Sequence, residues 1–141
     1  MAINNSKRLN IVISYLYPNL INNIDYNLQN DSDGKGTYLI WHNTEITKPT
    51  DKKIADEKEN AMNDYWWKLL RKKRDKLLMD SDWSQVADIP SDLKTSYVTY
   101  RNDLRDLPTA VSKPNFDTLN NQEVNKWIED INSLMPSNPK E

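Results

Sequence analysis

Apolar residues recur at helical spacing near the start of the chain. Between Ser6 and Tyr17 they fall three or four positions apart, at Leu9, Val12, Ile13 and Leu16. This spacing predicts an amphipathic helix with Ser6 as its N-cap and Pro18 as its end. The run Ile11–Ile13 is β-branched and leaves a strand as the alternative, because such residues favour extended structure.

The pattern then changes to alternation. Residues 26–29 alternate apolar and polar, residues 31–36 are rich in turn formers, and residues 37–41 are rich in β-formers. This order predicts a β-hairpin. Both glycines of the chain, Gly34 and Gly36, lie in its turn, where the backbone would need a positive φ.

A long stretch without helix breakers follows the connector 42–49. It runs from Thr50 to about Met79, and Thr50 suits the N-cap position after Pro49. Its apolar stripe is sparse early and dense late: Ile54, Ala61, Tyr65, Trp66, Leu69, Leu70, Leu77 and Leu78. At 1.5 Å per residue, roughly 30 residues form a rod of about 45 Å. Because Lys52–Asn60 is nearly all charged, we expect this part to project from the core or to pack on something else.

Two more helices are predicted after a break at residues 80–84. The first begins with Ser91 as N-cap and ends at Pro108. Its apolar face comprises Leu93, Tyr97, Tyr100, Leu104 and Leu107. The second begins at Thr118 or Asn120, and its apolar face comprises Val124, Trp127, Ile128, Ile131 and Leu134. We expect Pro136–Glu141 to be a frayed tail.

These elements predict an α+β fold that is mostly α. A small N-terminal helix and a β-hairpin occupy residues 1–49. A long helix and a helical hairpin occupy residues 50–112, and a C-terminal helix and tail occupy residues 113–141.

The composition excludes several classes of function. The chain has 141 residues, no cysteine and a formal net charge of −2. The lack of cysteine excludes disulfides, thiolate chemistry and Cys-ligated zinc, and the charge predicts no general attraction to nucleic acid or membrane. No apolar run has the length of a signal peptide or a membrane span, so we expect the chain to be cytosolic when it is made.

Two local patterns suggest chemistry and are better explained structurally. His42 is the one histidine, has no Cys partner, and is not part of an identifiable Ser-His-Asp set. The segment Asp31–Gly36 matches a calcium loop at positions one, three and six. However, Lys35 occupies position five, and His42 stands at position twelve, where a bidentate Glu is needed. We therefore predict a hairpin turn, with no metal, no cofactor and no enzymatic activity.

Charged residues gather on the two long helices. The stretch Lys68–Lys76 is strongly basic and follows Trp66 and Trp67. It could bind nucleic acid or an acidic partner, but its cations spread around the helix, which favours a solvated face. Arg and Asp on facing helices can lock a helical hairpin through bidentate pairs. The residues available for such pairs are Arg74, Asp75, Asp82, Arg101, Asp103, Arg105 and Asp106.

Three blocks in this region resemble the phage tail-assembly chaperone-like domain found in tail-fibre assembly proteins. Trp67–Leu78 contains R-x-x-R-D-x-L-L, Ser81–Trp83 and Asp88–Pro90 supply the Ser-Asp-Trp break and the Pro-led turn, and Tyr100–Pro108 supplies the Tyr-Arg helix. One departure is Tyr97, where many members of the family carry Trp. The segment from residue 115 onward carries no family resemblance.

The front of the chain resembles small XkdW-like tail proteins of phages and prophages. The shared pattern is Tyr-Pro-Asn at residues 17–19, a hairpin with Asp-Gly at residues 33–34, a Trp at 41 and Pro-Thr at residues 49–50. Together the two resemblances imply a non-catalytic chaperone that binds a phage tail or tail-fibre structural protein. The alternatives are a permanent virion connector and, less favoured, a nucleic-acid-binding module that uses Lys68–Lys76.

The resemblance also implies where the partner would bind. Aromatic and Arg side chains dominate interface energetics, so we expect the client to contact some of Trp66, Trp67, Arg74, Trp83, Tyr97, Tyr100, Arg101 and Arg105. We expect no small-molecule substrate and no membrane partner. The expected location is the host cytoplasm during phage assembly, with retention in the virion tail as the alternative.

Overall fold

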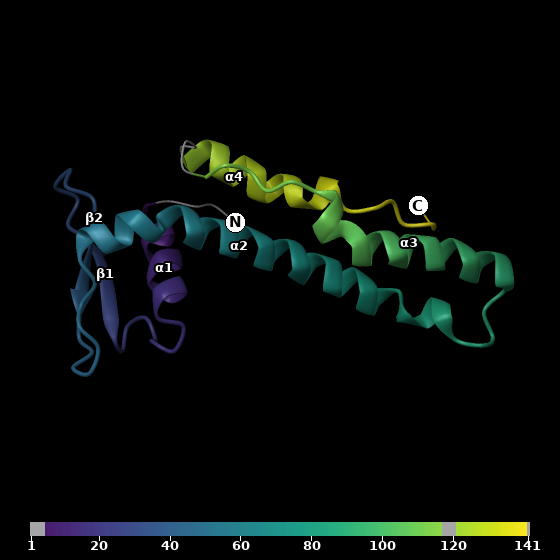
Figure 1. Ribbon diagram of the computed structural model, residues 1–141, viewed down its shortest axis with the longest axis horizontal. Helices are drawn as coiled ribbons and strands as arrows, with labels where there is room; N and C mark the ends of the chain where they lie inside the picture. Colours follow the sequence, from purple (N-terminus) through teal and green to yellow (C-terminus); the bar gives the residue numbers. More distant parts are fainter. Residues whose placement is uncertain (1–4, 117–120, 141) are drawn as a thin grey trace. The chain divides into compact units, whose positions relative to one another are not determined.

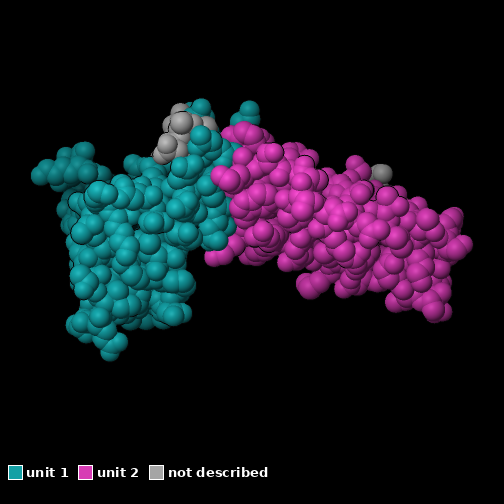
Figure 2. Space-filling view, in the orientation of Figure 1, with its two compact units in different colours: residues 1–65, 114–126 teal, residues 66–113, 127–141 magenta. Residues whose placement is uncertain are grey.

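The computed structural model describes residues 5–116 and 121–140 of the chain (Figure 1). Over these residues the protein is largely helical with one antiparallel β-hairpin, which confirms the predicted mostly α, α+β class. Two compact units are distinguished. Unit 1 comprises residues 1–65 and 114–126, and unit 2 comprises residues 66–113 and 127–141 (Figure 2).

Unit 1 begins with helix α1 (Asn5–Leu16), which is followed by strands β1 (Tyr26–Asn30) and β2 (Thr37–Trp41). The helix and the hairpin are both confirmed, but the predicted N-cap is wrong, because Ser6 lies inside the helix and its Oγ lies 2.6 Å from the Thr37 Oγ1. The turn between the strands places Gly34 at φ 81° and Gly36 at φ 84°, a conformation that costs glycine little and other residues more.

The core of the hairpin region is small and formed by residues from all three elements. Ile13 from α1, Tyr26 from β1 and Leu39 from β2 are buried together. Trp41 stacks on Tyr26 with ring centroids 6.2 Å apart. This packing explains why the β-branched run in α1 is helical, because Ile13 faces the hairpin and buries its side chain there.

Helix α2 (Asp51–Asp80) is the long helix that the sequence predicts. Its N-terminus is capped as expected, because the Thr50 Oγ1 accepts a hydrogen bond of 3.1 Å from the backbone N–H of Lys53. The charged first half of the helix is mostly exposed, although Ile54 packs against the hairpin core. The boundary between the two units falls within this helix, between Tyr65 and Trp66.

In unit 2 the chain turns through the 3-10 helix η1 (Asp82–Gln85) and returns along α3 (Ser91–Ala110), so α2 and α3 form a helical hairpin (Figure 1). Two predicted boundaries of α3 are wrong. The N-cap is Pro90, which makes no side-chain cap bond, and Ser91 is already helical. Pro108 lies inside the helix, although a proline removes one N–H from the helical hydrogen bonding. The helix continues past it, and the N–H of Val111 donates to the carbonyl oxygen of Leu107.

The last elements are α4 (Asn121–Glu129) and the 3-10 helix η2 (Asp130–Leu134). The predicted helix is thus present, while its predicted start at Thr118 or Asn120 lies outside the described residues. The expected frayed tail is wrong for residues 136–140. This segment packs on the helical hairpin of unit 2. Asn138 accepts a hydrogen bond from the Tyr97 hydroxyl, and the Lys140 ammonium lies over the Trp83 ring.

Candidate functional site

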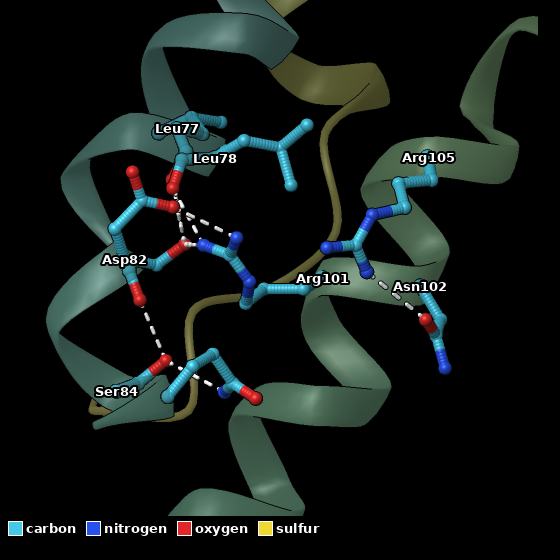
Figure 3. A network of polar contacts seen from close by, with 9 residues as sticks. Leu77, Leu78, Asp82, Ser84, Arg101, Asn102 and Arg105 are labelled. Atoms are coloured by element: carbon cyan, nitrogen blue, oxygen red, sulfur yellow. Dashed lines mark hydrogen bonds and ion pairs between the residues drawn. The ribbon is translucent and has the colours of Figure 1, made fainter.

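A buried arginine joins α3 to the end of α2 (Figure 3). The Arg101 Nη1 donates to the carbonyl oxygen of Leu78 at 2.6 Å and to the Ser81 Oγ at 2.8 Å. Its Nη2 lies 2.8 Å from the Asp82 Oδ1. Because the Asp82 side chain is 64% exposed, solvent screens the ion pair, and the two inner hydrogen bonds contribute more to stability.

Serine hydroxyls hold the break that follows α2. Ser81 and Ser84 are both buried. The Ser81 Oγ lies 2.8 Å from the carbonyl oxygen of Leu77, and the Ser84 Oγ donates to the carbonyl oxygen of Ser81 at 2.6 Å. The bond to Leu77 satisfies a carbonyl group that has no helical partner at the end of α2. The Ser-Asp-Trp block therefore terminates the helix and provides two of the three acceptors for Arg101, the third being the carbonyl oxygen of Leu78.

The pairing of Arg and Asp that was predicted to lock the hairpin is confirmed for Arg101 and Asp82, but it is a single contact and not bidentate, and Asp82 lies in η1 and not on a facing helix. The other candidate arginines contact neighbours on their own helices. Arg74 pairs with Asp75 at 2.9 Å, and Arg105 donates to the Asn102 Oδ1 at 3.2 Å, one turn along α3 from Arg101 (Figure 3).

An aromatic cluster lies beside the lock. The rings of Trp83 and Tyr97 meet edge to face with centroids 5.0 Å apart, and those of Tyr97 and Tyr100 with centroids 5.9 Å apart. Tyr97 and Tyr100 are 2% and 4% exposed, whereas Trp83 is 36% exposed. The cluster is therefore core on the tyrosine side and accessible at Trp83.

The eight residues expected to bind a partner differ in exposure. Trp66, Tyr97, Tyr100 and Arg101 are buried, Trp67 and Arg74 are half-buried, and Trp83 and Arg105 are exposed. The structure brings four of them together where α3 packs against η1: Trp83, Tyr97, Tyr100 and Arg101. In this state the side chains that a partner could contact directly are chiefly Trp83 and Arg105, and their role in binding stays a prediction.

Sequence reasoning missed two apolar residues in the same region. Met79, near the end of α2, is 70% exposed, and Val86, after η1, is 52% exposed. With Trp83 they form the apex patch, three exposed apolar side chains in the last turn of α2 and in the segment that joins it to α3. One feature of the sequence could have revealed them. Both residues stand among charged and turn-forming residues, and neither belongs to the apolar face of α2 or α3.

The basic stretch Lys68–Lys76 is partly neutralised by its own helix. Lys76 pairs with Asp80 at 2.6 Å, and the guanidinium carbon of Arg71 lies 5.5 Å from the centre of the Trp67 ring. These contacts favour the predicted solvated helix face.

Unit 1 contains a cavity of about 690 Å³ that the sequence did not reveal. Its walls come from α1, β2 and the start of α2, and they include the apolar residues Leu9 and Ile54. Lys35, Lys48 and Lys58 also line it, and none of these lysines makes an ion pair with a residue that the structure describes. Because these lysines come from three separate segments, no local pattern in the sequence brings them together.

The carboxylate of Asp31, in the turn of the β-hairpin, bonds to side chains of the two strands. Asp31 accepts hydrogen bonds from Gln29 and Tyr38, which lower the pKa of the carboxyl group, that from Gln29 most. The His42 Nε2 lies 2.6 Å from the Asn27 Oδ1 on the neighbouring strand. Within residues 5–116 and 121–140, no group of three or more His, Cys, Asp or Glu side chains could hold a metal ion.

Comparison with known families agrees with both resemblances, but the absence of a resemblance from residue 115 onward is wrong, because the second match extends to residue 126. No curated protein and no solved structure matches the chain. The described helices include none with the length and apolar character needed to cross a membrane. The model of the phage tail assembly chaperone protein family matches residues 67–126, and that of the XkdW protein family matches residues 9–66. These matches support a role in phage tail assembly and suggest a non-enzymatic one, so the chain is similar to XkdW proteins in its first half and to phage tail assembly chaperones in its second.

Proposed function

We propose that this protein is a phage tail assembly chaperone that binds a tail or tail-fibre structural protein non-covalently in the host cytoplasm. The observation that carries the proposal is the family match over residues 67–126, which includes the return of α2 through η1 into α3. A chaperone of this kind must cover apolar surface on its client until assembly. It therefore needs accessible apolar side chains on a rigid support.

The apex patch supplies such side chains. Met79, Trp83 and Val86 are exposed at the turn of the hairpin, where the bonds of Arg101 fix the two helices. Trp is among the residues that contribute most to binding energy at interfaces. We assign the apex patch as the first contact with the client, with Arg105 as a candidate polar contact on α3.

Co-expression with each large tail and tail-fibre protein of the same phage, followed by size-exclusion chromatography, tests the proposal. We expect one of these proteins to co-elute with the chain. Trp83→Ala and Val86→Asp should weaken that complex at least about tenfold, which corresponds to about 1.4 kcal/mol. Val98→Ala is the matched control, because Val98 is 40% exposed on α3 but lies outside the apex patch.

The results separate the function from the site. If no tail protein co-elutes, the proposed function is wrong. If a complex forms and the apex variants bind as tightly as the control, the function stands and the assignment of the apex patch fails. Mass spectrometry of purified virions distinguishes the alternative of a permanent connector, because a chaperone should be absent there and a connector present in stoichiometric amount.

A further inference from the structure

The C-terminal segment of unit 2 lies over the aromatic cluster. The side chain of Met135 packs against the core formed by Tyr97, Tyr100 and Leu104. Beyond it, the Tyr97 hydroxyl donates a hydrogen bond of 2.9 Å to the Asn138 Oδ1. The segment therefore covers the side of the cluster that belongs to α3.

The same segment also reaches the exposed side of the cluster. The Lys140 ammonium lies 4.0 Å from the centre of the Trp83 ring, a cation–π contact. The backbone N–H of Lys140 donates to the Asn138 Oδ1, so one amide group holds both the turn of the segment and the Tyr97 hydroxyl. Lys140 thus covers one of the three residues of the apex patch.

Side chains provide nearly all the attachment of this segment. Residues 135–140 form no helix or strand. Among described residues the segment's one backbone–backbone hydrogen bond is at its start, from the N–H of Met135 to the carbonyl of Asn132. Pro136 and Pro139 carry no N–H to donate. The segment can therefore leave without breaking any bond of the Arg101 lock.

Departure of the segment would uncover apolar surface. The Tyr97 hydroxyl would lose its acceptor, and Met135 would no longer cover the tyrosine core. A contiguous apolar surface of this kind marks a binding site when it is occupied and an aggregation hazard when it is bare. An internal segment that a client can displace would prevent aggregation before binding and free the surface for the client.

We propose that the surface under Met135–Lys140 is a docking site for an extended segment of the tail protein, and that the chain's own C-terminal segment occupies it at rest. This inference rests on the proposed function. The internal occupant defines the chemistry of the partner. Its segment supplies an unbranched apolar side chain, an amide oxygen for the Tyr97 hydroxyl and a cation for the face of Trp83.

The test uses the full chain and a fluorescently labelled peptide of residues 135–140, acetylated and amidated. The double variant Asn138→Ala/Lys140→Ala loosens the internal segment and leaves the surface intact. We expect the peptide to bind this variant about tenfold more tightly than the unchanged chain, the ratio for a cover that is in place about nine-tenths of the time. Lys113→Ala matches the loss of charge at an exposed site and should bind the peptide like the unchanged chain.

Equal peptide binding by the variant and the unchanged chain, or no binding to either up to millimolar peptide, would overturn the inference. The co-expression experiment then separates it from the proposed function. If the peptide binds the loosened variant but no tail protein is retained, the cover is real and the chaperone function is wrong. If a tail protein binds both chains with equal affinity, the function stands and the cover does not compete with the client.

Discussion

Replacing Arg101 by alanine should destabilise the helical hairpin by about 2–6 kcal/mol. Each of the two inner hydrogen bonds comes from a charged donor, and such a bond contributes about 1.5–3 kcal/mol. The ion pair with exposed Asp82 adds at most about 1 kcal/mol. The buried Nε of Arg101 has no hydrogen-bond partner among the described residues, and its removal regains about 1 kcal/mol.

Native-state hydrogen exchange read by mass spectrometry locates this loss within the chain. Since 1.4 kcal/mol corresponds to a factor of ten, even the smallest loss of about 2 kcal/mol should make amides of α3 exchange about 25-fold faster in Arg101→Ala. Amides of β1 and β2 serve as an internal reference, because they belong to unit 1 and the bonds of Arg101 lie within unit 2.

Three further variants separate the possible causes. Arg105→Ala removes an equal charge from the exposed side of α3 and should change stability by less than about 0.5 kcal/mol. Asp82→Ala should cost less than about 1 kcal/mol. Arg101→Met keeps the volume of the aliphatic stem but leaves the Ser81 hydroxyl without its donor. It should therefore lose most of the stability that Arg101→Ala loses. If Arg101→Ala behaves like Arg105→Ala, the lock does not stabilise the hairpin and the reasoning is refuted.

Two other predictions concern unit 1. Thr50→Ala should destabilise the start of α2 by about 1 kcal/mol, measured by urea unfolding, because the N–H of Lys53 loses its cap; Thr50→Ser keeps the cap and is the control. Hydrogen bonding, that from Asn43 most, lowers the pKa of Asp25 below 3.8. The unchanged chain should therefore be more stable than Asp25→Asn at pH 6. That difference should shrink as the pH falls through the lowered pKa, and a gap that stays constant throughout the acid titration would contradict the assignment.

Local patterns in the sequence predicted most of the elements. The helix at Leu9–Leu16, the hairpin around Gly34 and Gly36, and the cap at Thr50 each depend on residues a few positions apart. Such signals act through backbone geometry, so they can be read without knowing the fold.

The errors came from contacts between distant positions. Asn138 meets Tyr97 across 41 positions, so nothing near Asn138 in the sequence indicates that the tail is held. Pro108 remains inside α3, where its neighbours Leu104 and Leu107 are buried, so packing on the core face outweighs the loss of one backbone bond.

The candidate site was harder to predict for a chemical reason. Protein cores and the centres of interfaces are both rich in aromatic residues, and buried arginines occur in both. Composition alone therefore could not separate Trp66, which is fully buried, from Trp83, which is exposed. That distinction requires the burial of each side chain, which depends on the tertiary structure.

The lock also gives a physical meaning to the sequence resemblance. The Ser-Asp-Trp block and the Tyr-Arg block are separate in the sequence, but Arg101 bonds to both Ser81 and Asp82, and Tyr97 contacts Trp83. The two blocks are therefore one structural unit, the closure of the hairpin. A motif that closes a hairpin can be shared by chaperones with different clients, because the bonds of Arg101 to Leu78 and Ser81 fix the helices within the chain itself. We propose that specificity for a client comes from the apex patch, which the closure leaves accessible, and from the surface that the C-terminal segment covers at rest.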